Sequence, residues 1–223
     1  MKRLFEGKVY DLQLGTNAVV FSYFKGETKE NQQIIFFKMV SLENGVVSDA
    51  PKSVYFLTKF GTNYLPAVEF AENYVEARAL SLSDGKAFVC NRDGTAALFD
   101  INGEPLWQGI LKYRNRAPSA IAMYGENLWG SFEELNALLR FSTKTLREEL
   151  RIGGKNSILK TPKSLFIEDS FAYLSLGNEN KIVRINLITY EAEDYLYFDE
   201  PVHDFVKSGE KQFVALKSGV YMI

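Results

Sequence analysis

The first candidate for chemistry is the only histidine of this 223-residue chain. His203 stands next to Asp204 in the segment 201–207, so Ser-His-Asp catalysis could occur only here. Neighbouring residues of a strand point to opposite faces, however, and Asp204 cannot easily orient His203. No G-x-S-x-G nucleophile motif accompanies the pair. We therefore expect a polar residue of an inner strand and predict no catalytic residue.

The sequence gives no support for a metal or a cofactor. One histidine cannot supply the two or three nitrogens of most catalytic zinc sites, and Cys90 is the only cysteine. A lone cysteine is typically a small buried residue. The spacing of a calcium loop, a phosphate-binding loop or a dinucleotide fingerprint does not occur. We expect neither a metal site nor a cofactor.

Two adjacent carboxylates are the next candidates. Glu133 and Glu134 lie in a predicted loop between two strands, and Asp93 and Glu179 occupy the corresponding loops of neighbouring repeats. Two carboxylates facing one another across a channel could hydrolyse a glycosidic bond. Exposed loop carboxylates are more often simply solvated, so both interpretations stay open.

A short basic segment is interleaved with an aromatic residue. Tyr113, Arg114 and Arg116 lie in one predicted connection, and Arg92 lies in a neighbouring loop. Such a set could bind an anionic partner or ligand, or it could be a solvated rim. With 26 basic and 28 acidic residues the net charge is −2, which gives no reason to expect nucleic acid as the partner.

The elements that must position these residues are strands. Short runs rich in Val, Ile, Phe and Tyr alternate with Asn-Gly and Asp-Gly pairs, which are typical of tight hairpins. Runs after a tight turn begin at Ala87, Leu128, Ala172 and Phe213, which are 41, 44 and 41 residues apart. Four strands in each repeat of about 40–45 residues are typical of a β-propeller blade.

The repeats predict five blades. Three complete units lie at 77–108, 118–152 and 162–198, and a fourth covers 8–47. The last unit, from residue 202 to residue 223, has three strands, whereas residues 1–7 form a strand without a unit. The N-terminal strand is therefore predicted to complete the C-terminal blade, which protects two strand edges. We expect one all-β domain over residues 1–223.

This pattern resembles the broad group of β-propeller repeat proteins. The segment from Phe99 to Trp107, FDINGEPLW, is similar to the end of a WD-type or quinoprotein-type blade, although the Gly-His and Trp-Asp signatures of WD repeats are missing. The resemblance implies a face that binds a ligand or partner around a central channel. It implies no particular chemistry.

Two insertions interrupt the repeat, one at residues 24–33 and one at about residues 53–76. The second holds six aromatic residues, among them Phe60, Tyr64 and Phe70. These could form a satellite core over the rim, or they could form an aromatic docking surface. A six-bladed ring with this insertion as a degenerate blade is an alternative.

Together these observations favour a non-catalytic binding module. We expect a protein partner, with a glycan possible, on the face that carries the insertion and the Arg114 connection. A carbohydrate-binding or glycoside-hydrolysing propeller that uses loop carboxylates is the alternative. The chain shows neither a signal peptide nor an apolar run of about 18 residues. We expect a cytoplasmic monomer that does not contact membranes.

Overall fold

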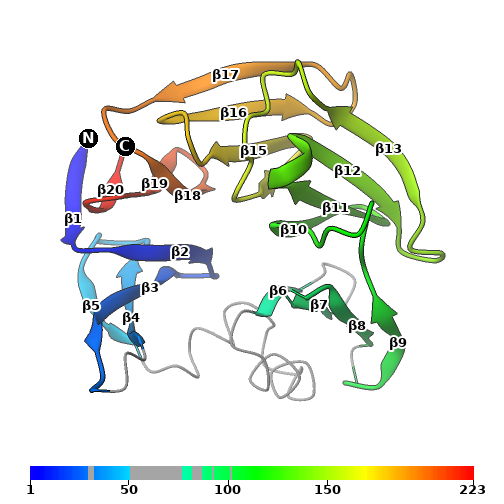
Figure 1. Cartoon of the computed structure of the whole chain (residues 1–223). Helices are drawn as coiled ribbons and strands as arrows, with labels where there is room; N and C mark the ends of the chain where they lie inside the picture. Colours follow the sequence, from blue (N-terminus) through cyan, green and yellow to red (C-terminus); the bar gives the residue numbers. More distant parts are fainter. Residues whose placement is uncertain (30–32, 51–76, 82–86, 92, 101) are drawn as a thin grey trace.

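The computed structural model describes residues 1–29, 33–50, 77–81, 87–91, 93–100 and 102–223. These residues form five four-stranded antiparallel sheets, arranged in a ring around a central axis (Figure 1). The prediction of an all-β, five-bladed propeller is confirmed.

In sheets 1 to 4, strands that are consecutive in the sequence are neighbours in the sheet. Sheet 1 contains β2 (Val9–Leu14), β3 (Ala18–Glu27), β4 (Gln33–Ser41) and β5 (Val47–Ala50). Sheet 2 contains β6 (Ala77–Ser81), β7 (Ala87–Asn91), β8 (Thr95–Phe99) and β9 (Pro105–Ile110). Sheet 3 contains β10 (Ala120–Tyr124), β11 (Asn127–Phe132), β12 (Ala137–Ser142) and β13 (Glu148–Gly153). Sheet 4 contains β14 (Phe166–Glu168), β15 (Phe171–Leu176), β16 (Lys181–Asn186) and β17 (Ala192–Tyr197).

Sheet 5 is closed by the two ends of the chain, as predicted. Its order is β1 (Lys2–Glu6), β20 (Gly219–Met222), β19 (Lys211–Leu216) and β18 (Val202–Ser208). The N-terminal strand β1 pairs with β20 in antiparallel register, and the two ends lie side by side (Figure 1). Phe5 of β1 contacts Phe21 and Tyr23 of sheet 1, with ring centroids 5.1 and 4.9 Å apart. The closing strand therefore also joins sheet 5 to sheet 1.

Apolar side chains fill the spaces between consecutive sheets. Phe88, Leu128 and Phe141 belong to the core between sheets 2 and 3, and Trp129 and Leu174 to the core between sheets 3 and 4. This arrangement follows from the alternation of each strand, which gives every sheet two buried faces.

One feature of sheet 1 differs from the prediction. The surplus at 24–33 was predicted as an inserted loop, but β3 continues to Glu27 and pairs with β4 past a bulge between Phe24 and Gly26. Gly26 pairs with Ile34. Part of the predicted insertion at 24–33 therefore lengthens the hairpin of β3 and β4. The predicted insertion at 53–76 lies outside the described residues.

Antiparallel topology divides the connections between two faces of the ring. One face carries the loops between second and third strands and the connections between consecutive sheets. We call it the loop face. The strands β2, β14 and β18 begin at this face, and each is the innermost strand of its sheet (Figure 1). Residues at the start of these strands are therefore brought together around the axis.

Candidate functional site

The group with the most unusual environment is the carboxyl of Asp204, near the start of β18. Its Oδ2 accepts a hydrogen bond of 2.9 Å from the Leu12 N–H of β2, and its Oδ1 accepts one of 2.8 Å from the Phe205 N–H. The Ser164 side chain also hydrogen-bonds to it. Residues of sheets 1 and 5 thus hold this carboxyl in one orientation, and Asp204 is partly buried.

Burial raises the pKa of Asp204 from 3.8 to about 7. The charge of Asp11 raises this pKa further, whereas the hydrogen bonds from Leu12, Phe205 and Ser164 lower it. Loss of solvation, which disfavours the charged form, is the largest of these effects. At neutral pH the carboxyl is therefore close to half protonated, which suits a group that both takes and gives a proton.

Asp11 occupies the corresponding position in β2. It pairs with Ser22, and its Oδ1 accepts a short hydrogen bond from the Ser22 hydroxyl. Register shifts lie between Val9 and Asp11 in β2 and between Val202 and Asp204 in β18. Bulges of this kind change the direction of side chains and are frequent beside active sites.

His203 is the extra residue at the bulge of β18. Its carbonyl accepts a 3.1 Å hydrogen bond from the Ser175 hydroxyl of sheet 4. Partial burial lowers the pKa of the imidazole, and the charges of Lys163 and Lys8 lower it further, while Glu200 opposes them. The bulge interrupts strict alternation at His203, while the Asp204 carboxyl accepts from Leu12 and Phe205.

In sheets 3 and 4 a serine of the second strand binds the start of the inner strand. In sheet 3 the Ser131 hydroxyl accepts from the Ala120 N–H at 3.1 Å. In sheet 4 the Ser175 hydroxyl accepts from the Ser164 N–H at 3.2 Å. Neutral hydroxyls hold these inner strands, whereas the inner strands of sheets 1 and 5 themselves carry a carboxylate, Asp11 or Asp204.

The structure places the predicted basic and acidic residues on the loop face. Tyr113 and Arg116 form a tight hairpin with hydrogen bonds of 2.9 and 3.0 Å, and Arg114 at its tip has a φ of 50°. Arg116 pairs with Glu134 at 2.7 Å. Glu133 lies 3.9 Å from Lys163. Glu133 is thereby linked to the surroundings of His203, whereas the Arg114 hairpin belongs to the connection between sheets 2 and 3.

Four predicted binding residues lie outside the described residues. They are Phe60, Tyr64, Phe70 and Arg92, and their role stays a prediction. Among the residues that the structure describes, no three His, Cys, Asp or Glu side chains form a group that could hold a metal ion. No helix within the same residues is long and apolar enough to cross a membrane.

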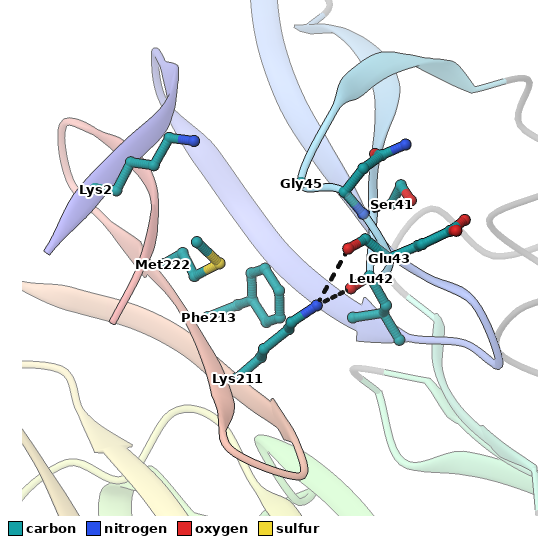
Figure 2. A pocket seen from close by; sticks show the side chains of 9 residues that line it. Lys2, Ser41, Leu42, Glu43, Gly45, Lys211, Phe213 and Met222 are labelled. Atoms are coloured by element: carbon teal, nitrogen blue, oxygen red, sulfur yellow. Dashed lines mark hydrogen bonds between the residues drawn. The ribbon is translucent and has the colours of Figure 1, made fainter.

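A small hollow lies on the opposite face, between sheets 1 and 5 (Figure 2). Its volume is about 140 Å³, and Lys2, Lys211 and the turn from Ser41 to Gly45 line it. The Lys211 ammonium donates to the carbonyls of Leu42 and Glu43. The Lys211 ammonium therefore already has backbone partners, and we do not place the functional site in this hollow.

Our sequence interpretation missed that the charge of Asp11 acts on Asp204, although a signal was present. Residues 9–12 read Val-Tyr-Asp-Leu and residues 202–205 read Val-His-Asp-Phe. Both segments begin the innermost strand of a repeat, and the two repeats are neighbours once the ring closes. The shared pattern would have brought two carboxylates together at the axis.

Comparison with known proteins identifies solved structures of similar fold but no family to which the chain belongs. No family model matches the chain, and no curated protein matches its sequence. Glutaminyl cyclase of Myxococcus xanthus is 8% identical with a TM-score of 0.54, over 98% of this chain and 93% of that one. Streptogramin B lyase is 13% identical with a TM-score of 0.51, over 96% of this chain and 64% of that one. Virginiamycin B lyase of Staphylococcus aureus is 11% identical with a TM-score of 0.50, over 100% of this chain and 72% of that one.

These neighbours overturn our prediction of a non-catalytic binding module. All three are named as enzymes, two lyases and one cyclase, so the prediction is wrong in taking the fold to favour a scaffold. Its physical error was to treat every polar residue of an inner strand as structural, whereas Asp204 has a strongly raised pKa. At identities of 8–13% the likeness itself shows the fold alone. The chain also spans less than two thirds of the streptogramin B lyase chain.

Proposed function

We propose that this protein is an enzyme whose reaction proceeds by proton transfer at the loop-face end of the central axis. Asp204 is the group that transfers the proton. The observation that carries this proposal is the placement of the carboxyl between sheets 1 and 5, where the N–H groups of Leu12 and Phe205 hold both oxygens and burial raises its pKa to about 7. Strongly shifted pKa values gather at functional sites, because catalytic acids and bases need a pKa near the working pH.

The surrounding groups determine how Asp204 would act. The N–H groups of Leu12 and Phe205 fix the orientation of both oxygens, so the carboxyl loses little freedom when a substrate binds. In its ionised form it would take a proton from the substrate, and in its protonated form it would return one. Burial, and to a smaller extent the charge of the neighbouring Asp11, raises the pKa of Asp204 and so favours its protonated form.

The matched enzymes support a reaction of this kind. A lyase breaks a bond by elimination and a cyclase closes a ring, and each reaction moves a proton off one atom and onto another. Positioned acids and bases contribute about 10²- to 10⁴-fold to such steps. The names of the matched enzymes together with Asp204 therefore support an elimination or a ring closure as the proposed class of reaction.

The remaining predictions for the loop face are compatible with this proposal. Arg114, Arg116, Glu133 and Glu134 would form part of the rim around the bound substrate. A closer relation to WD-type or quinoprotein-type blades, a cytoplasmic location and a monomeric state stay predictions.

A substrate panel tests the proposed function. The panel contains a streptogramin B antibiotic, a glutaminyl peptide and small organic acids, each incubated with the protein in D2O. Mass spectrometry detects new products, and NMR detects deuterium taken up at carbon. We expect turnover of at least one member and a loss of at least about 100-fold in Asp204→Asn.

The matched control is Asp199→Asn, which changes an exposed carboxyl in the connection before β18. This variant should keep the activity of the parent. Equal turnover by Asp204→Asn and the parent would overturn the assignment of Asp204. A carboxyl that titrates below pH 5 would overturn it whatever the panel shows.

A further inference from the structure

We propose that the substrate of this site carries a carboxylate group, which Lys8 and Lys163 bind on the loop face beside His203. This inference rests on the proposed function, because it names the class of molecule on which Asp204 would act. It is argued from how the two lysines are held and from the charges that surround them.

Lys163 is held by a rigid backbone. Its N–H donates to the Ser175 carbonyl at 2.9 Å, and the Gly177 N–H donates to the Thr161 carbonyl at 2.9 Å. The Thr161 N–H in turn donates to Asn136 Oδ1 at 2.9 Å. Thr161 has a φ of 48°, which is strained for a β-branched residue. Strain of this kind persists where the surroundings impose it, and it gathers at ligand sites.

Gly177 makes room for the Lys163 side chain. A Cβ at Gly177 would lie 2.3 Å from Lys163 Cε and 2.6 Å from its Cδ, distances that no packing allows. Any other residue at 177 would displace the lysine from this position. The ammonium then lies 3.9 Å from Glu133, too far for a good hydrogen bond, and can accept a further anion.

Lys8 is positioned by aromatic rings instead of a carboxylate. The Phe24 N–H donates to its carbonyl at 2.9 Å, and its Nζ lies 5.4 Å from the ring centroids of both Tyr10 and Phe24. Among the described residues, no carboxylate lies within 4 Å of this ammonium. A cation held by ring faces keeps its N–H donors available for a ligand.

Glu200, whose charge opposes that of the two lysines at His203, is already engaged in hydrogen bonds. The Glu200 carboxylate accepts hydrogen bonds from the N–H and the hydroxyl of Ser218. The charges of Lys8 and Lys163 both act on His203, whose pKa they lower. Two cations beside a half-buried imidazole favour an anion, and a carboxylate bound there would relieve their effect on His203.

The single histidine is a direct probe of this site. We would label the protein with ¹³C-histidine and follow its only imidazole signal by NMR during titration with acetate and with benzoate. We expect a saturable change of the signal and a rise of the His203 pKa when the carboxylate is bound. Lys163→Gln should weaken binding by about tenfold and should raise the His203 pKa in the free protein. Lys8→Gln should act in the same directions.

Two controls make the result specific. Lys160→Gln changes a lysine in the same connection, whose ammonium donates to the Lys155 carbonyl, and it should leave binding unchanged. Asp204→Asn should still bind acetate, so that binding and proton transfer are tested separately. A His203 signal that carboxylates leave unchanged would overturn the inference. A response to inorganic phosphate without a response to acetate would overturn it as well.

Discussion

The two sides of the ring differ in the polar groups that surround the start of the inner strand. In sheets 3 and 4 the inner strand is bound at its start by the hydroxyl of a buried serine, Ser131 or Ser175. In sheets 1 and 5 the inner strand itself carries a carboxylate, Asp11 or Asp204. The hydroxyls satisfy the backbone without charge, whereas Asp204 loses solvation and has a pKa of about 7.

The serine hydroxyls serve the fold, whereas the buried carboxyl of Asp204 is a group that the fold only tolerates. An ionised carboxyl in a buried place opposes folding, so the charge of Asp204 carries a cost that a serine at this position would not have. A residue that breaks a local rule without a structural gain indicates function. We therefore expect the two sides of the ring to respond oppositely to substitution.

The largest effect should come from Asp204→Ser, which replaces the carboxyl of sheet 5 by a neutral hydroxyl and should change the pH dependence of stability. Because the folded-state pKa of Asp204 lies above 3.8, its contribution to stability is complete below about pH 4 and is lost as the pH rises through 7. The difference between 3.8 and about 7 corresponds to about 4 kcal/mol. In Asp204→Ser this part of the pH dependence should disappear. Urea unfolding of parent and variant between pH 4 and 8 measures it.

The loss of the Leu12 hydrogen bond adds a cost to Asp204→Ser that does not vary with pH. Only the pH-dependent difference between the two proteins therefore counts. Parallel curves of unfolding free energy against pH for parent and variant would show that Asp204 does not titrate between pH 4 and 8. Sheet 5 would then not differ from sheets 3 and 4 in the way described.

The second effect concerns the closure of the ring, which holds the two carboxylates next to each other. Phe5 of β1 contacts Phe21 and Tyr23 of sheet 1. Removal of this ring in Phe5→Ala should lower the free energy of unfolding by about 2–4 kcal/mol. Leu106→Ala, which truncates an exposed side chain of β9, is the control and should change stability little. Equal effects of the two substitutions would mean that β1 does not close the ring.

The closure shows how much of this molecule the sequence predicts. Repeat spacing and hairpin pairs determine the strands, and the three-stranded last unit predicts the pairing of β1 with β20. The site is harder, because the environment of Asp204 depends on Leu12, which lies 192 residues away in the chain. Desolvation is a property of packing, and the bulge at His203 cannot be read from alternation alone.

A smaller effect should follow from removing the neighbouring charge. Asp11→Asn keeps an oxygen that can accept from Ser22 but removes the charge that raises the pKa of Asp204. The pKa of Asp204 should fall by about one unit or less, and the lower limb of the pH–rate profile should move with it. An unchanged Asp204 pKa in this variant would show that the two carboxyls do not interact.

The smallest effect is expected on the neutral side. Ser131→Ala removes a hydroxyl that accepts from the Ala120 N–H, which should lower the free energy of unfolding by about 1 kcal/mol. Neither the activity nor the pKa of Asp204 should change. Thermal unfolding and the activity assay check this, and a loss of activity would remove the distinction between the two sides.

The most direct test of the account is the titration of Asp204 itself. The carboxyl carbons of ¹³C-aspartate-labelled protein are followed by NMR from pH 3 to 9, and the signal missing from Asp204→Asn identifies the residue. The account predicts a midpoint near 7. A midpoint near 4 would show an ordinary solvated carboxylate, and the proton-transfer site proposed here would then have no basis.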